Sequence, residues 1–96
     1  MNGPLRLLHL EDDPDYCDLV RSLLTNEGFQ VESVLAHDRL GFEAVLAPEK
    51  FDVILADYLL PAYNGIEALR LAREKCPETP FLLVSLWARI IWGEMS

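Results

Sequence analysis

The sequence predicts a single α/β domain in which a parallel sheet is covered by helices on both faces, a three-layer sandwich. Four short apolar runs alternate along the chain with three segments whose apolar residues recur at helical spacing. Strands that alternate with helices of about ten to fourteen residues imply βαβ units with right-handed crossovers, and hence a parallel sheet. One run, Val53–Ala56, is apolar without alternation, which is typical of a strand buried on both faces.

The first strand is expected at Leu5–Leu10, and a helix follows it after a short acidic turn. Asp13 before Pro14 predicts the start of this helix, because aspartate caps free N–H groups and proline fits the first helical position. Gly28 is expected to end the helix in a left-handed conformation. The helix carries an apolar stripe that we expect to face the sheet, formed by Tyr16, Leu19, Val20, Leu23 and Leu24.

The remaining elements repeat the same alternation. A second and more peripheral strand is expected at Phe29–Val34, and a helix over about residues 38–47 follows it. Pro48 stops this helix because a proline ring clashes with the preceding turn. The third strand, the third helix and the fourth strand are expected at residues 51–57, 65–76 and 81–85.

Composition and charge restrict the classes of function. The chain has 96 residues, of which 51% are hydrophobic and 25% charged, as in one small globular domain. Its net charge of −8 argues against a protein that binds a phosphate backbone, since no basic stripe is present. No run approaches the roughly 20 apolar residues of a membrane span, and the first residues lack the pattern of a signal peptide, so we expect neither. Because Cys17 and Cys76 are far apart and lack metal-ligand spacing, we expect reduced cysteines and a cytoplasmic protein. From the charge and the absence of a long apolar run, we expect no direct nucleic-acid or membrane contact.

Polar side chains follow three of the predicted strands at the point where each strand ends. Glu11 and Asp12 follow the first strand. Asp57 ends the third strand and Ser85 the fourth. These groups are expected to converge, because the carboxyl ends of parallel strands lie at the edge where open α/β sheets bind ligands. Carboxylates that share a pocket repel one another unless a cation neutralises them, and an all-oxygen set favours Mg²⁺. With Mg²⁺ bound, Asp57 becomes a candidate nucleophile toward phosphorus, and Ser85 a candidate donor to a phosphoryl oxygen.

Three residues near this edge have plainer interpretations. Asp57 taken alone is more often a carboxylate that caps a loop, and only its neighbours favour a chemical role. His9 lies within the first apolar run and is expected to be a core histidine with its hydrogen bonds satisfied, rather than a phosphoryl donor or a ligand. Asp13 is expected to act only as the helix cap.

The chain resembles a known family, the receiver domains of two-component response regulators, which have a flavodoxin-like fold. The resemblance covers roughly residues 4–85 and depends on three motifs in order. They are the apolar strand before Glu11-Asp12-Asp13-Pro14, the loop Asp57-Tyr58-Leu59-Leu60-Pro61-Ala62-Tyr63-Asn64-Gly65, and the strand Phe81–Ser85. Each motif is weak alone, whereas their order and separation are specific.

This resemblance implies a role for each matching residue. Asp57 matches the phosphoacceptor, Asp12 the direct Mg²⁺ ligand, and Glu11 a second acid that often acts through water. The backbone carbonyl of Leu59 joins these carboxylates, Asp57 included, in the coordination that the protein supplies. Ser85 matches the residue whose hydroxyl moves to meet the phosphoryl group.

The chain departs from the family after Ser85. Receiver domains continue through a further helix, a fifth strand that ends in a lysine, and a last helix, whereas residues 86–96 resemble none of these. We therefore expect a partial receiver domain at residues 1–85, lacking the fifth strand and the last helix, and an atypical tail at residues 86–96. The lysine that would pair with the phosphoryl group is missing, and Leu86 stands where the family usually has a small residue.

Without those elements, the edge of the fourth strand and one face of the first helix are expected to be uncovered. We expect a homodimer or a swapped assembly in which the tail or a partner's edge covers these surfaces. The alternative is a marginally stable fragment whose assembly in isolation carries no biological meaning.

The leading hypothesis for function is phosphorelay signalling, in which Asp57 accepts a phosphoryl group from a sensor histidine kinase or a phosphotransfer protein. Such a domain is not an enzyme beyond its own phosphorylation and dephosphorylation. A degenerate receiver that binds proteins without phosphorylation is the main alternative, because the lysine is missing. An aspartate-nucleophile phosphatase of the haloacid dehalogenase type uses a second aspartate two residues after the nucleophile, where this chain has Leu59.

Overall fold

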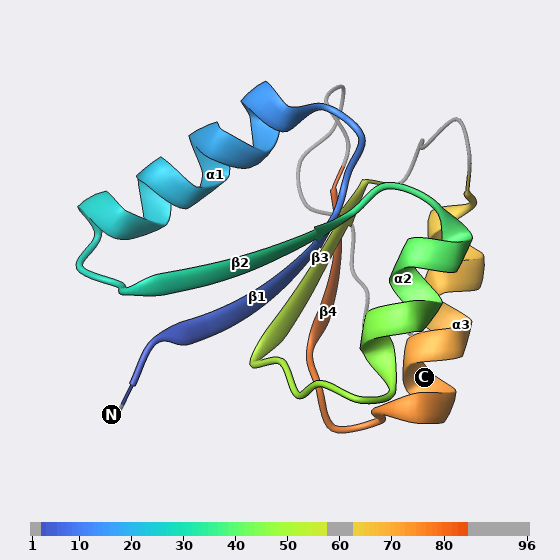
Figure 1. The fold of residues 1–96 in the computed structure, drawn as a ribbon. Coiled ribbons are helices and arrows are strands. Elements are labelled where there is room, and N and C mark those ends of the chain that lie inside the picture. Colours follow the sequence, from blue (N-terminus) through green and yellow to red (C-terminus); the bar gives the residue numbers. More distant parts are fainter. Residues whose placement is uncertain (1–2, 58–62, 85–96) are drawn as a thin grey trace.

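The computed structural model describes residues 3–57 and 63–84. Its elements follow one another in the order β1 (Leu5–Leu10), α1 (Pro14–Asn26), β2 (Val31–Ala36), α2 (Arg39–Leu46), β3 (Val53–Asp57), α3 (Gly65–Lys75) and β4 (Phe81–Val84). The four strands form one parallel sheet in the order β2-β1-β3-β4. Helix α1 lies on one side of this sheet, and α2 and α3 lie on the other (Figure 1). The predicted three-layer α/β class is therefore confirmed.

Parallel pairing brings the carboxyl ends of the strands to one edge of the sheet. Leu10 near the end of β1 pairs with Ala36 of β2 and with Ala56 of β3. Asp57 at the end of β3 pairs with Val84 at the end of β4. Residues that directly follow β1 therefore lie beside the last residues of β3, which in turn lie beside the last residues of β4.

Local capping signals explain where the helices begin. The Asp13 side chain accepts a hydrogen bond from the backbone N–H of Asp15 at 3.0 Å, and Pro14 occupies the first helical position. Asn64 acts in the same way at the start of α3, where its Oδ1 accepts from the N–H of Ile66 at 2.7 Å. The predicted role of Asp13 as a cap is confirmed, because it supplies an acceptor to an otherwise unpaired helix N–H.

The second strand begins two residues later than predicted. Gly28 has a φ of +100°, which reverses the chain after α1 as expected. The N–H of Phe29 then donates back to the carbonyl of Leu24 at 3.1 Å, so Phe29 belongs to the turn. Its aromatic ring is 48% exposed. The apolar character of Phe29 suggested a strand residue, whereas the closing hydrogen bond of the helix determines where β2 can start.

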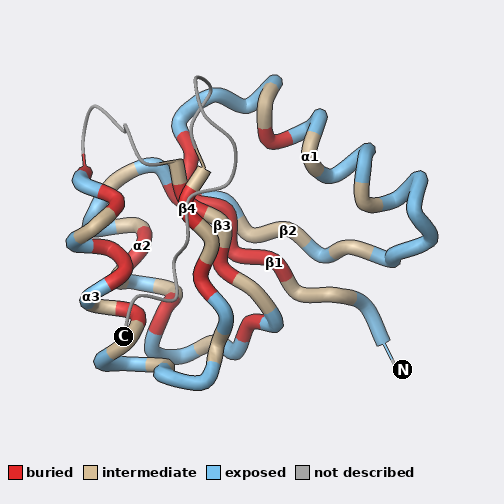
Figure 2. Tube along the Cα trace, turned by 180° about the vertical axis from the view of Figure 1, so that it is seen from behind, coloured by how far each residue is buried: buried red, intermediate tan, exposed pale blue. Residues whose placement is uncertain are grey.

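The main core lies between the sheet and the pair α2 and α3. Figure 2 shows buried residues gathered in the strands and in these two helices, while α1 is mostly half-buried or exposed. The buried cluster comprises Leu8, Leu10, Ala36, Phe42, Leu46, Phe51, Ile54, Ala56, Tyr63, Ala68, Leu69, Ala72, Phe81 and Leu83.

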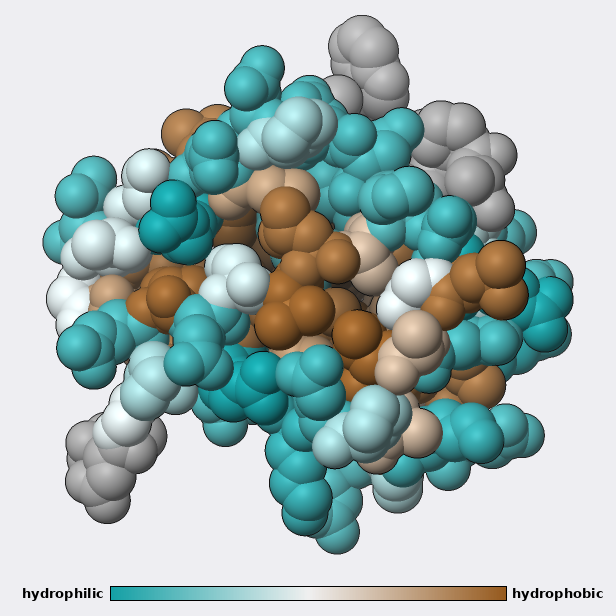
Figure 3. Space-filling view, viewed as in Figure 1, coloured by the Kyte–Doolittle hydropathy of each residue, from teal (hydrophilic) through white to brown (hydrophobic). Residues whose placement is uncertain are grey.

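The opposite face of the sheet is covered only in part by the described helices. Helix α1 packs mainly against β2. Val53 and Leu55 of β3 are half-buried, so the expectation of a strand buried on both faces holds for one face only. Leu19 and Leu23 of α1 are 53% and 56% exposed, so part of the apolar stripe does not face the sheet, in agreement with the expectation that one face of this helix is uncovered. Seen from the same direction as Figure 1, hydrophobic side chains gather near the middle of the visible surface (Figure 3).

Candidate functional site

Glu11 and Asp57 lie next to each other at the carboxyl edge of the sheet. Leu10 and Ala56 are paired neighbours on β1 and β3, and both are buried on the side of α2 and α3. Because side chains alternate along a strand, Glu11 and Asp57 both point toward the side of α1. They line one small depression together with His9, Tyr16, Ala56 and Val84.

Glu11 is a buried acid in a negative environment. Its residue is only 7% exposed, and its carboxylate accepts a hydrogen bond from the backbone N–H of Asp13 at 3.1 Å. Burial, with a smaller contribution from the charges of Asp57 and Asp12, raises the pKa of Glu11 from 4.5 to about 7, against the opposing effect of the Asp13 hydrogen bond. A cation bound beside Glu11 would lower this pKa, because its positive charge offsets the neighbouring carboxylates and favours the ionised form of Glu11.

Two residues in the first turn of α1, Tyr16 and Cys17, also have pKa values raised by burial and by the nearby acids. Burial is the main cause that raises the pKa of the Tyr16 hydroxyl, and the charges of Glu11 and Asp57 add to it. Burial also raises the pKa of the Cys17 thiol to about 11, with Glu11 as the next cause. Sequence analysis assigned Tyr16 only to an apolar stripe, whereas its ring borders the acidic edge. Its position in the first helical turn after the acids was the signal that could have placed it there.

His9 is buried beneath the acids without full hydrogen bonding. Its residue is 1% exposed, and Nε2 has no hydrogen-bond partner among residues 3–57 and 63–84. The imidazole contacts the ring of Tyr16 edge-on, with ring centroids 5.9 Å apart and planes at 64°. Burial lowers the pKa of His9 to about 4, although the charge of Asp57 opposes this shift, so the ring is neutral at neutral pH. The prediction of a core position is confirmed, but the prediction of satisfied hydrogen bonds is wrong, and an orphaned nitrogen of this kind costs about 1–3 kcal/mol.

The donor set at this edge is chemically suited to a hard cation. Glu11, Asp12 and Asp57 supply only oxygen, and Mg²⁺ is usually bound by one or two carboxylates together with water molecules. Within residues 3–57 and 63–84, no three histidine, cysteine, aspartate or glutamate side chains lie close enough to hold a metal ion on their own. Leu59 and Ser85, which the resemblance adds to the site, lie outside the described residues.

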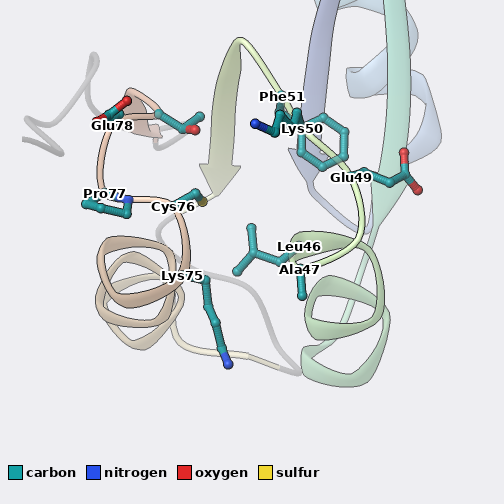
Figure 4. Close-up of a pocket in the computed structure, with 10 residues that line it drawn as sticks. Leu46, Ala47, Glu49, Lys50, Phe51, Lys75, Cys76, Pro77 and Glu78 are labelled. Atoms are coloured by element: carbon teal, nitrogen blue, oxygen red, sulfur yellow. The ribbon is translucent and has the colours of Figure 1, made fainter.

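A second hollow lies at the opposite end of the sheet. Figure 4 shows Leu46 from α2 and Cys76 from the end of α3 pointing into it. Its wall also includes Lys50, Lys75 and Glu78. It lies near the amino ends of β3 and β4, and its acids Glu49 and Glu78 are accompanied by both lysines, so it does not offer the acidic site expected at the carboxyl edge.

Comparison with known proteins decides the family. The family model described as "Response regulator receiver domain" matches residues 7–91. This chain belongs to the response regulator receiver domain family. The matched range extends past residue 85, and the boundary placed there between domain and tail stays a prediction.

Relatives of this receiver domain include two transcriptional regulatory proteins. TrcR of Mycobacterium tuberculosis is 39% identical over 85 residues, which cover 86% of this chain and 32% of TrcR. CpxR of Escherichia coli K12 is 33% identical over 81 residues, which cover 83% of this chain and 33% of CpxR. The receiver domain therefore spans about a third of the length of either relative.

A solved structure supports the same assignment. The CheY-like response regulator receiver domain protein of Methanospirillum hungatei JF-1 superposes with a TM-score of 0.74 at 29% identity, covering 90% of this chain and 67% of that protein. Receiver domains of response regulators are signalling domains, which implies phosphoryl acceptance. In the part of the receiver domain that the structure describes, no helix combines the length and the apolar character needed to cross a bilayer.

Proposed function

We propose that this receiver domain works in phosphorelay signalling and accepts a phosphoryl group on Asp57 from a sensor histidine kinase or a phosphotransfer protein. One observation carries most of the proposal: Asp57 ends β3 beside the buried acid Glu11, whose pKa is raised mainly by burial and in part by the charges of Asp57 and Asp12. Such a site is suited to bind a divalent cation and then a phosphoryl group. In this function the domain is not an enzyme beyond its own phosphorylation and dephosphorylation.

The proposed transfer is a displacement at phosphorus. A carboxylate oxygen of Asp57 forms an O–P bond while the N–P bond of the donor's phosphohistidine breaks, and the departing imidazole takes up a proton. Glu11, Asp12 and Asp57 would hold Mg²⁺ together with the backbone carbonyl of Leu59, and Mg²⁺ would supply charge compensation for the phosphoryl oxygens. Ser85 would donate a hydrogen bond to one of those oxygens.

An alternative function is a degenerate receiver that binds other proteins without being phosphorylated. The exposed side chains of Leu19 and Leu23 on α1 favour this alternative, because apolar side chains of this size in water often mark a contact surface. The alternative predicts that loss of the Asp57 carboxylate leaves partner binding unchanged.

We also propose that the exposed edge of β4 and the tail support a homodimer or a swapped assembly. Within the described sheet β4 pairs only with β3, and its residues Phe81–Val84 carry no charge that would discourage edge pairing. Sedimentation velocity should show mass increasing with concentration, whereas a folded monomer at high concentration would contradict the assembly. The domain itself is expected to act in the cytoplasm and to contact no membrane. Its net charge of −8 argues against direct contact with the phosphates of a nucleic acid.

Beryllofluoride tests the proposed function, because it mimics a phosphoryl group on an aspartate. Calorimetric titration in the presence of Mg²⁺ should show saturable one-to-one binding to the wild type. Asp57→Asn is the matched control, since it keeps the size of the side chain and removes the acceptor charge. Binding that is absent from the wild type, or equal in Asp57→Asn, would overturn the assignment of Asp57.

A further inference from the structure

The imidazole of His9 lies diagonally below Asp57 on the same face of the sheet. His9 on β1 pairs with Leu55 on β3. Asp57 is two residues beyond Leu55, so the side chains of Asp57, Leu55 and His9 lie on the same face of the sheet. His9 and Asp57 line the same depression, with Tyr16 as part of its wall. The two side chains therefore share one small depression, and the charge of Asp57 acts on the imidazole.

The surroundings of His9 leave its Nε2 with few choices of partner. The depression has no room for a water molecule, so a bridging water cannot satisfy the nitrogen. Glu11 already accepts a hydrogen bond from the N–H of Asp13, which directs its carboxylate toward the turn. The remaining wall is formed by the Tyr16 ring in edge contact and by apolar side chains. Among the described residues of this wall, Glu11 and Asp57 carry carboxyl oxygens, and Asp57 is the one whose charge acts on the imidazole.

We propose that His9 is a positioning residue for Asp57, and that its Nε2–H donates a hydrogen bond to the Asp57 carboxyl group when the site binds Mg²⁺ and a phosphoryl group. This inference rests on the proposed function of Asp57. The bond would hold one orientation of the carboxyl group, so that its other oxygen faces the incoming phosphorus. Tyr16 maintains the orientation of the imidazole through the edge contact of the two rings.

The identity of residue 9 agrees with this role better than with a purely structural one. Leu7, Leu8 and Leu10 surround it in β1, and all three are buried. A leucine at position 9 would fill the same space without an unpaired nitrogen.

Two substitutions separate positioning from packing. His9→Leu removes the donor and keeps an apolar side chain of similar size. His9→Gln keeps an amide N–H near the place of Nε2. Beryllofluoride affinity in Mg²⁺ should fall about tenfold in His9→Leu and stay within about threefold of wild type in His9→Gln. Thermal unfolding of the same samples should show His9→Leu to be at least as stable as wild type.

The outcomes distinguish failure of the positioning role of His9 from failure of the acceptor role of Asp57. Equal affinity in His9→Leu and wild type, or an equal loss in both variants, would overturn the positioning role while leaving Asp57 as the acceptor. If the wild type binds no more beryllofluoride than Asp57→Asn, the proposed function fails and the role of His9 fails with it. A loss of affinity confined to His9→Leu, with the fold intact, supports positioning.

Discussion

The carboxylate of Glu11 accepts a hydrogen bond from the backbone N–H of Asp13 at 3.1 Å, which ties the acid at the end of β1 to the turn that starts α1. Despite this bond, burial and the charges of Asp57 and Asp12 raise the pKa of Glu11 from 4.5 to about 7. The folded chain therefore retains a proton on Glu11 over a range of pH in which the unfolded chain has released it.

Glu11 should make the protein less stable as pH rises through this range. Between about pH 4.5 and 7 the folded state binds more protons at Glu11 than the unfolded state, so the free energy of unfolding falls with increasing pH. The glutamine of Glu11→Gln cannot ionise. We expect this variant to lose the contribution of Glu11 to the pH dependence, which lowers the free energy of unfolding by up to about 3 kcal/mol. Urea unfolding at a series of pH values, with EDTA present, measures the difference. Parallel profiles for wild type and Glu11→Gln would contradict the raised pKa.

His9 should have the opposite dependence. Burial lowers its pKa from 6.5 to about 4, so the unfolded state binds more protons between these values. The contribution of His9 to stability is therefore present above about pH 6.5 and is lost as pH falls toward 4. In the wild type the two slopes oppose each other between about pH 4.5 and 6.5 and should give a flat profile. His9→Leu should expose the fall caused by Glu11, and Glu11→Gln the rise caused by His9. A wild-type profile steeper than both variants would refute this balance.

Asn64 should account for a measurable share of the stability of α3. Its Oδ1 accepts from the backbone N–H of Ile66 at 2.7 Å and of Glu67 at 3.4 Å. Asn64→Ala leaves these groups without the acceptor and should cost about 1 kcal/mol in the free energy of unfolding. Asn64→Asp is the control, because it retains the acceptor and places a negative charge at the helix start. Chemical denaturation should rank Asn64→Ala below both wild type and Asn64→Asp.

The two cysteines should differ sharply in reactivity. Both are free thiols, but Cys17 is buried in α1 whereas Cys76 is half-buried beside the hollow near the amino ends of β3 and β4. Burial raises the pKa of Cys17 to about 11, so its thiol stays protonated and unreactive. A disulfide reagent should modify Cys76 in the native protein and Cys17 only on unfolding. Cys76→Ser should lose the native reaction, and its persistence in that variant would show that Cys17 is accessible.

Features with a local cause could be predicted from the sequence. The starts of α1 and α3 depend on Asp13 and Asn64, whose side chains bond to N–H groups two residues away. The parallel direction of the strands likewise follows from the alternation of strands and helices. Parallel strands place Glu11 and Asp57 at one edge of the sheet. Short-range chemistry and βαβ topology were sufficient for these parts of the fold.

Features that depend on long-range packing could not be predicted in this way. The spacing of Leu19 and Leu23 is that of a buried helix face, and only the family resemblance, which shows that the covering elements are missing, predicted that such a face is exposed. The unpaired Nε2 of His9 depends on the walls that Tyr16 and Asp57 form around it. Helical periodicity shows that residues share a face, and it does not show what lies opposite that face.

Phosphorylation by acetyl phosphate tests the central claim most directly. Intact-mass spectrometry should show the addition of one phosphoryl group to the wild type in Mg²⁺, and none in EDTA or in Asp57→Asn. The acyl phosphate should also be lost on treatment with hydroxylamine. A wild type that gains no phosphoryl group, or an Asp57→Asn variant that gains as much as the wild type, would contradict the assignment of Asp57 as the phosphoacceptor.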